Sequence, residues 1–396
     1  MAAIARLFNC NGVLNRRGLR LLLSAVFATP AFAQQAAKPS ADKPTSDYWV
    51  YVGAESADLI HRIRFGPGGA VVEKSIGVGE SPVEMEGPHG LQISPDGKYL
   101  HMTTGHGSPD GKYWKFELGP DTLVGPGIFL GFFPASIDVT PDGLYAFVVN
   151  FNLHGEMVPS SVSVVYTPTN TEVARTTTCV MPHGSRVEPS GALQYSTCMM
   201  DDQLVEIDTR TFQVSRRFGL GKTNAGPIAA TASNEHAHHT PGRPMAPASC
   251  SPTWAQPSAD GAKIFVACNK ADSIIEIDRV SWSVTRKLAT GRGPYNLAVT
   301  PNGQQLVASL KQGGAVQVFD LASGRSVMLE KSSTTVTHGI AISSDSRYAF
   351  VSNESVGAKP GRVDVYDLQA LTRVASVDVG QQAGGIAFWK MAPSRQ

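Results

Sequence analysis

The sequence lacks a charge excess of either sign. Its 396 residues include 34 Lys and Arg against 33 Asp and Glu, so the formal net charge is +1, and only 17% of the residues are charged. Proteins that bind nucleic acids or anionic membrane surfaces by electrostatic attraction usually carry a clear basic excess. We therefore expect no nucleic-acid partner. The 42% hydrophobic content is typical of a folded globular protein.

Common catalytic motifs are also missing. The chain contains no GxSxG nucleophile elbow, no Walker-type loop, no HExxH helix, no dinucleotide fingerprint after a strand and no CxxCH for c-type haem. Any chemistry must therefore be carried by residues that no short motif marks.

Long apolar runs occur only near the N-terminus. The run Leu21–Ala28 follows four arginines and precedes the Ala31–Ala33 segment, AFA, which is typical of a secretory signal with its cleavage site. We predict a signal peptide over 1–33 and a flexible polar linker over 34–47. The segment NRRGLR loosely resembles a twin-arginine signal, which leaves the export route open.

Removal of the signal peptide leaves 30 basic against 33 acidic residues, a net charge of −3. No later stretch reaches the roughly 18 uncharged apolar residues of a membrane span. The sequence therefore predicts an exported protein, periplasmic or secreted, without a membrane span.

Internal repeats determine the fold prediction. The 39 Gly and 26 Pro indicate many tight turns, and six segments share a strand, a Pro-Asp-Gly-like turn and a second strand. They begin at residues 89, 135, 183, 253, 295 and 338, and a shorter copy, GGIAFW, begins at Gly384. Most repeats continue with a third and a fourth strand, and four strands per repeat are typical of a propeller blade.

We predict an all-β, seven-bladed β-propeller over 48–391. The last repeat lacks its outer strands, and residues 49–79 have only outer strands, so the two ends of the chain should complete one blade together. The longer spacing after the fourth blade predicts an insertion over 222–249 at the entrance of the axial funnel.

Strand ends such as FVVN (147–150), FVAC (265–268) and FVSN (350–353) resemble the YVTN family of bacterial seven-bladed propellers. The resemblance covers nearly all of the mature chain and implies the fold. It implies little about chemistry, because this scaffold hosts lactonases, lyases, metalloenzymes, haem proteins and binding modules.

Histidines are the main candidate site residues. His89, His183 and His338 occupy the same repeat position, six residues before the turn, so we expect them at one height around the axis. His106 and His154 follow second strands and should lie at the same end. Neutral imidazoles are the commonest ligands of copper, iron and zinc, so we predict that these five residues bind a metal. Alternatively, the repeated His-Gly is a turn in which the imidazole caps backbone carbonyls.

The placement of His89, His183 and His338 is similar to that in three propeller families. They are the haem-d1 propeller of cytochrome cd-type nitrite reductases, nitrous oxide reductase and thiocyanate dehydrogenase. The resemblance implies a cofactor on the axis: copper first, iron second, with a haem-type group still open. The chain lacks the cupredoxin domain of the nitrous oxide enzyme and a full set of cluster histidines, so a smaller site is expected.

Cysteines and two charged residues complete the candidate set. Cys198 and Cys268 end equivalent second strands, while Cys179 and Cys250 precede equivalent first strands, so we predict the disulfides Cys179–Cys198 and Cys250–Cys268. Thiolate ligation of a soft metal is the alternative. Arg186 and Glu354 are candidates to orient a substrate, although structural roles explain both.

Three functions fit these patterns. The first is an exported copper or iron redox enzyme that acts on a small-molecule substrate, with an electron-transfer partner. The second is a metal-assisted hydrolase or lyase, because propeller lactonases and streptogramin lyases resemble this scaffold. The third is a non-enzymatic binding or assembly protein.

Overall fold

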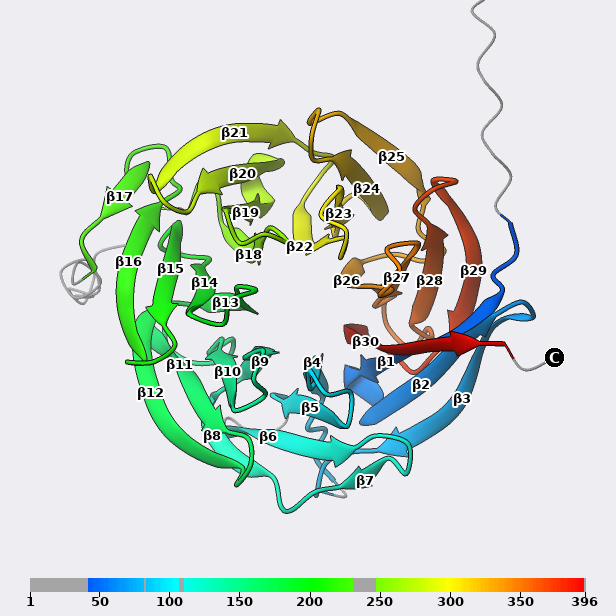
Figure 1. Cartoon of the computed structure of the whole chain (residues 1–396). Helices are drawn as coiled ribbons and strands as arrows, with labels where there is room; N and C mark the ends of the chain where they lie inside the picture. Colours follow the sequence, from blue (N-terminus) through cyan, green and yellow to red (C-terminus); the bar gives the residue numbers. More distant parts are fainter. Residues whose placement is uncertain (1–41, 82, 107–109, 231–246, 395–396) are drawn as a thin grey trace, which may run out of the picture. The chain divides into compact units, whose positions relative to one another are not determined.

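The computed structural model describes residues 42–394 apart from 82, 107–109 and 231–246. In this part of the chain, strands β1 to β30 form seven separate antiparallel sheets. Figure 1 shows the sheets as blades around a common axis, with one strand of each blade nearest the centre. The predicted all-β, seven-bladed propeller is confirmed.

The blades are numbered here from the one that contains both ends of the chain, and their strands are given from the axis outward. Blade 1 contains β30 (Ala383–Pro393), β1 (Ser46–Ala54), β2 (Leu59–Gly66) and β3 (Gly69–Gly77). Blade 2 contains β4 (Pro88–Ile93), β5 (Tyr99–Thr104), β6 (Asp110–Glu117) and β7 (Thr122–Leu123), and β8 (Ile128–Phe132) also pairs with β6. Blade 3 contains β9 (Pro134–Val139), β10 (Tyr145–Asn150), β11 (Pro159–Tyr166) and β12 (Thr171–Val180).

The remaining blades repeat this order. Blade 4 contains β13 (Pro182–Val187), β14 (Leu193–Cys198), β15 (Gln203–Asp208), β16 (Gln213–Gly219) and β17 (Gly226–Ile228). Blade 5 contains β18 (Pro252–Pro257), β19 (Lys263–Cys268), β20 (Ser273–Asp278) and β21 (Ser283–Ala289). Blade 6 contains β22 (Pro294–Val299), β23 (Gln305–Leu310), β24 (Ala315–Asp320) and β25 (Ser326–Lys331). Blade 7 contains β26 (Thr337–Ile342), β27 (Tyr348–Asn353), β28 (Arg362–Asp367) and β29 (Thr372–Asp378).

Both ends of the chain close the ring in blade 1, as predicted. β1 pairs with β30 in an antiparallel register that places Val50 opposite Phe388 and Val52 opposite Ile386. The pairing begins at Ser46, opposite Pro393, so the last two residues of the expected linker belong to the first strand. Closure with strands from both termini leaves no open gap in the ring.

The burial pattern changes from the inner strands to the rim. All six residues of β27 are buried, because both faces of a blade pack against neighbouring blades near the axis. Outer strands such as β12 alternate between exposed and half-buried residues over most of their length. A continuous apolar run and an alternating run are the two patterns expected for strands covered on two faces and on one face.

The connections include two short 3-10 helices among the described residues, η1 (Glu55–Ala57) and η3 (Asn269–Ala271), each after the second strand of a blade. The part of the predicted insertion that is described supplies β17, which pairs with β16. Its residues 231–246 and the predicted signal peptide lie outside the described residues. No helix in the described ranges is long and apolar enough to cross a membrane.

Two disulfides are present, with the predicted pairing. Cys179, in the outermost strand of blade 3, is bonded to Cys198 in blade 4. Cys250 is bonded to Cys268 in blade 5. These cysteines are therefore not available as thiolate ligands for a metal.

Candidate functional site

Each blade places the second residue of its innermost strand near the axis, at the end where the strand begins. We call these seven residues the inner positions. In blade order they are Gly384, His89, Ala135, His183, Thr253, Tyr295 and His338. The predicted equivalence of the three histidines is confirmed, since all three line the same narrow cavity on the axis.

The histidines are held by the next blade. His89 donates from Nδ1 to the carbonyl oxygen of Ala135, at 2.7 Å, and His183 donates from Nδ1 to that of Thr253, at 2.6 Å. Both acceptors are inner positions themselves. A carbonyl oxygen only accepts hydrogen bonds, so Nδ1 carries a proton, and in a neutral imidazole Nε2 then keeps its lone pair.

His338 follows the same plan less completely. The inner position of the next blade is Gly384. Burial lowers the pKa of His338, and the backbone of Gly384 acts in the opposite direction. However, Nδ1 of His338 makes no hydrogen bond of good geometry with the described residues.

Glycine follows each histidine, and at Gly90 and Gly339 the next blade approaches too closely for a side chain. A Cβ atom at Gly90 would lie 2.5 Å from the carbonyl oxygen of Ala135, and one at Gly339 would lie 2.8 Å from that of Gly384. The His-Gly pair therefore joins neighbouring blades, which confirms that the imidazoles of His89 and His183 cap backbone carbonyls. This role leaves Nε2 available for chemistry.

Six aromatic rings form a closed collar around the axis. Neighbouring ring centroids lie between 4.7 and 5.9 Å apart. In order around the collar, the rings belong to His89, His338, Tyr295, His183, Phe151 and Phe133. Within the collar, the Tyr295 hydroxyl lies 3.0 Å from Nε2 of His183.

A funnel of about 410 Å³ opens above the collar. Six of its 15 lining residues directly follow the second strand of a blade. These six residues are Glu55, Phe151, Met199, Asn269, Lys311 and Glu354. Charged side chains come from blades 6, 7 and 1, whereas Phe133, Phe151, Leu153 and Met199 form an apolar side.

Two carboxylates and a lysine organise the charged side of the funnel. Glu354 Oε1 lies 2.7 Å from Lys311 Nζ and 3.5 Å from Nε2 of His338. Glu55 Oε2 lies 2.8 Å from Nε2 of His106, and Glu55 Oε1 lies 3.8 Å from Nε2 of His89. The free nitrogens of two collar histidines therefore face one carboxylate each.

Burial controls the charge of these groups. It lowers the pKa of His183 to about 3 and that of His338 well below its usual range, so both imidazoles are neutral at pH 7. Burial also raises the pKa of Glu354, opposed by Lys311. Burial acts to lower the pKa of Lys311, but Tyr295 and Glu354 outweigh it and the pKa is raised.

The other predicted residues divide between the funnel and the channel below it. His106 lines the funnel, and the ring of His154 lies 5.9 Å from that of His106 and 5.5 Å from that of Phe133. Glu354 also lines the funnel. Arg186 lies below the collar, in the narrow cavity.

The three inner histidines do not form a ready metal site. Among the described residues, no group of three His, Cys, Asp or Glu side chains is arranged to hold a metal ion. His183 is separated from the carboxylate side by the Tyr295 hydroxyl that contacts its Nε2. His89 and His338 stand closer together, with ring centroids 5.9 Å apart.

Sequence reasoning missed Tyr295, Glu55 and Lys311. Tyr295 could have been found, because it occupies the same repeat position as the histidines. Glu55 and Lys311 follow second strands, as Glu354 does, and could have been found by aligning that position across the blades. Their proximity to particular histidines depends on neighbouring blades and needed the structure.

The fold and the funnel define the class: a seven-bladed propeller with a polar axial site. No protein-family model matches the chain, and no curated protein sequence matches it.

Solved structures share the architecture. The chain is similar to Kuenenia stuttgartiensis hydrazine synthase, with 18% identity, a TM-score of 0.58, and 77% of this chain and 91% of that one covered. It is also similar to a functionally unknown protein from Desulfotomaculum acetoxidans DSM 771, with 15% identity, a TM-score of 0.61, and 87% and 99% covered. At these identities the likeness concerns the fold alone.

Proposed function

We propose that this protein is an exported, metal-dependent redox enzyme that converts a small substrate on the floor of the funnel. The observation that carries the proposal is the pair of neighbouring inner histidines, His89 and His338, whose Nε2 atoms face the carboxylates of Glu55 and Glu354. Export agrees with the two disulfides, which persist in oxidising compartments.

The donor atoms suit a transition metal. In proteins, imidazole ligands are commonly oriented by a hydrogen bond from the other ring nitrogen to a carbonyl, as at His89. Two imidazoles with one carboxylate are typical of non-haem iron(II), and nitrogen and oxygen ligands also suit copper(II). The carboxylates therefore favour iron over copper. His183 would join the set only if Tyr295 moved away from its Nε2.

Each part of the funnel has a proposed task. The metal would accept electrons or act as a Lewis acid, and redox turnover would need an electron-transfer partner. Lys311 and Glu354 share a hydrogen-bonded contact of 2.7 Å and can hold or move a proton beside His338. The apolar side around Phe133 and Phe151 would position the non-polar part of the substrate.

Elemental analysis of protein purified from the exported fraction tests the proposal. We expect one equivalent of iron or copper, lowered more than about tenfold in His89→Ala and in His338→Ala. His61→Gln is the matched control, because His61, in β2, accepts a hydrogen bond from the Gly380 amide and does not line the funnel.

Other outcomes point elsewhere. Calcium, magnesium or zinc in place of iron or copper would favour a metal-assisted hydrolase or lyase. A wild-type protein that binds no metal even after reconstitution would overturn the proposal and favour a binding or assembly protein.

A further inference from the structure

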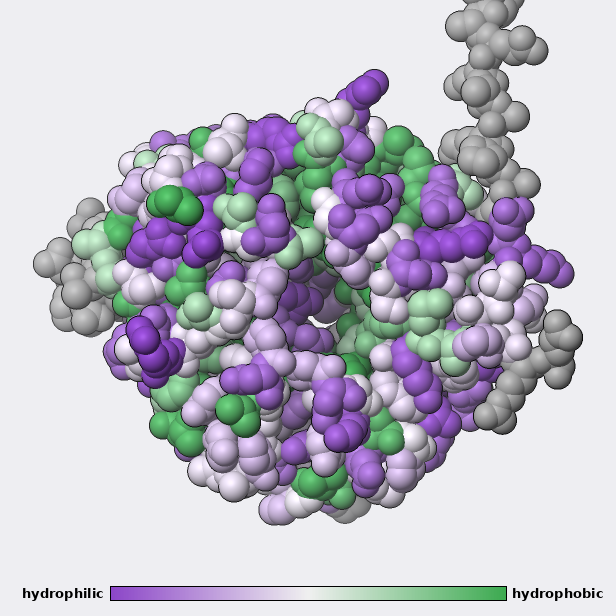
Figure 2. Space-filling view, viewed as in Figure 1, coloured by the Kyte–Doolittle hydropathy of each residue, from purple (hydrophilic) through white to green (hydrophobic). Residues whose placement is uncertain are grey.

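The axial channel narrows below the collar to a small cavity, which we call the waist. Its volume is about 40 Å³, and its lining includes the three inner histidines together with Arg186, Ser136 and Asn296. A water molecule needs about 10–15 Å³ measured in this way, so the waist has room for a small ion or a few waters. Figure 2 shows one face of the ring hollowed at the axis.

Arg186 brings a positive charge into the waist without an ion pair. Its Nη1 donates to the Ser185 carbonyl at 2.9 Å and its Nε donates to Gln256 at 3.3 Å, both neutral acceptors. The guanidinium lies over the Trp254 ring, 4.5 Å from its centroid. No carboxylate oxygen of the described residues lies within ion-pair distance of it. Burial lowers the pKa of Arg186.

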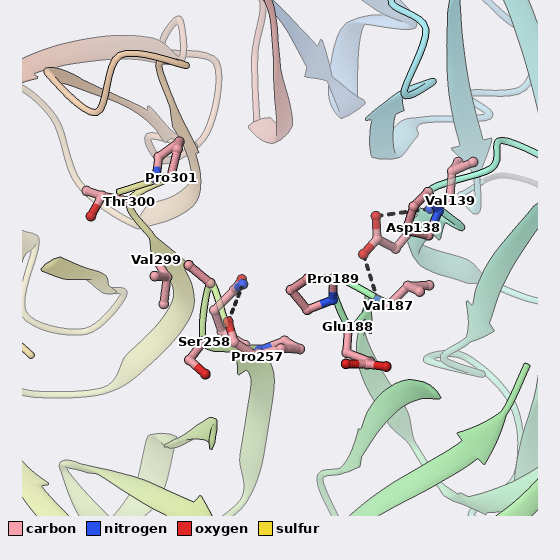
Figure 3. A pocket seen from close by; sticks show the side chains of 13 residues that line it. Asp138, Val139, Val187, Glu188, Pro189, Pro257, Ser258, Val299, Thr300 and Pro301 are labelled. Atoms are coloured by element: carbon pink, nitrogen blue, oxygen red, sulfur yellow. Dashed lines mark hydrogen bonds between the residues drawn. The ribbon is translucent and has the colours of Figure 1, made fainter. Parts of the chain in front are cut away.

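The carboxylate that stabilises the charge of Arg186 accepts its hydrogen bonds from other groups. Asp138 favours the charged form of Arg186. Its oxygens accept hydrogen bonds from the backbone amides of Val187, at 2.8 Å, and Val139, at 3.0 Å, and from the Gln92 side chain. Figure 3 shows the two backbone contacts, in the neighbouring cavity at the far end of the channel. Asp138 therefore does not fill the space in front of the guanidinium.

Two further polar groups in the waist lack partners. The Ser136 hydroxyl and the Asn296 Oδ1 make no hydrogen bond with the described residues, and both side chains are only 5% exposed. An unpartnered buried polar group costs about 1–3 kcal/mol. A bound anion would accept a hydrogen bond from the Ser136 hydroxyl and remove the cost there, whereas Asn296, whose unpartnered atom is an acceptor, could contribute only after its amide turns.

We propose that the waist binds a small monovalent inorganic anion, such as a halide or nitrate. The Arg186 guanidinium supplies the charge, the Ser136 hydroxyl donates a hydrogen bond, and the Asn296 amide presents its NH₂ group after a half-turn of the side chain. One cation without a direct ion pair, together with the small volume, favours a single charge over a bulky divalent oxyanion. The waist is also lined by His89 and His338, but the three residues proposed to hold the anion, Arg186, Ser136 and Asn296, are not among those proposed to hold the metal.

Bromide is the probe, added to the full-length mature protein in a buffer whose only other anion is gluconate. We expect one saturable bromide per chain, and anomalous scattering from a crystal soaked in bromide should place it beside Arg186. Arg186→Met should weaken binding more than tenfold, and Arg186→Lys should restore most of it because it returns the charge.

Lys311→Met is the matched control, since Lys311 is the cation of the funnel. Loss of bromide binding in Lys311→Met but not in Arg186→Met would overturn the proposal, as would water alone in the waist. If Arg186→Met does not fold, Ser136→Ala replaces it, with a severalfold loss expected and unchanged binding contradicting the proposal. Metal content should be the same in Arg186→Met, Arg186→Lys and Ser136→Ala as in the wild type, which separates this result from the test of the funnel.

Discussion

The two ends of the ring are built from the same repeat, yet they are organised differently. At the far end, a Ser or Thr stands two residues before the Asp or Asn of the turn, and its hydroxyl donates a hydrogen bond to the side chain of that Asp or Asn. The same hydroxyl accepts a hydrogen bond from the backbone amide three residues after the Asp or Asn. The pairs are Ser94 with Asp96, Thr140 with Asp142, Ser258 with Asp260, Thr300 with Asn302, and Ser343 with Asp345. Five blades thus use the same local device.

The entrance end shows no such uniformity. Its inner positions hold three histidines, a tyrosine and three small residues, and the contacts of the histidines run to another blade. His89, for example, reaches a carbonyl 46 residues away. The comparison indicates that local turns at the far end stabilise the repeated fold of the ring. The residues at the entrance end differ from blade to blade, so functional side chains can be placed there.

The largest effect should come from filling the close approach between blades at the entrance. A Cβ atom at Gly385 would lie 2.0 Å from the carbonyl oxygen of His89, so Gly385→Ala must push blades 1 and 2 apart. We expect a loss of unfolding free energy of about 3 kcal/mol or more, measured by urea denaturation.

Gly77→Ala is the matched control, because nothing lies within 4 Å of a Cβ atom built at Gly77. It should leave the urea midpoint almost unchanged. Equal losses in the two variants would show that the entrance is not held by close contact between blades.

The fold could be predicted because its signals are local and repeated. Proline-containing turns, alternating strands and a fixed spacing occur in each repeat, and the two incomplete ends match one blade. The disulfides could be predicted for the same reason, since Cys198 and Cys268 end equivalent strands.

The site could be predicted only in part. The repeat position of His89, His183 and His338 is visible in the sequence, but their partners are not. Whether an Nε2 atom faces Glu55, Glu354 or the Tyr295 hydroxyl depends on which blades are neighbours and on the loops after second strands. For the same reason, spacing alone could not show that His183 stands apart from His89 and His338.

The two ends should also differ in their response to acid. His183 has a folded-state pKa of about 3 against 6.5 for an ordinary histidine, because burial disfavours its charged form. The contribution of His183 to the unfolding free energy is complete above pH 6.5 and decreases as the pH falls toward 3. At pH 5 about 2 kcal/mol of it has been lost. Hydrogen bonds from Ser94 and Ser258 lower the pKa values of Asp96 and Asp260 below 3.8, so the turns lose stability only in stronger acid.

Urea midpoints at pH 7 and pH 5 check this prediction. The stability lost between the two pH values should be smaller in His183→Gln than in the wild type, by about 2 kcal/mol. His101, whose pKa burial also lowers to about 3, provides a second variant with the same expected change. An unchanged pH dependence in His183→Gln would mean that His183 is already protonated or solvated in the folded protein.

The smallest effect should come from one turn at the far end. Thr140→Val keeps the shape but removes the hydroxyl that donates to Asp142, at 2.6 Å, and accepts from the Tyr145 amide, at 3.0 Å. We expect a loss of about 1 kcal/mol in unfolding free energy. Thr300→Val removes the same contacts in blade 6 and should cost the same within about 0.5 kcal/mol, with additive losses in the double variant because blades 3 and 6 are not neighbours in the ring. Clearly unequal or coupled losses would show that the far end, like the entrance, depends on contacts specific to each blade.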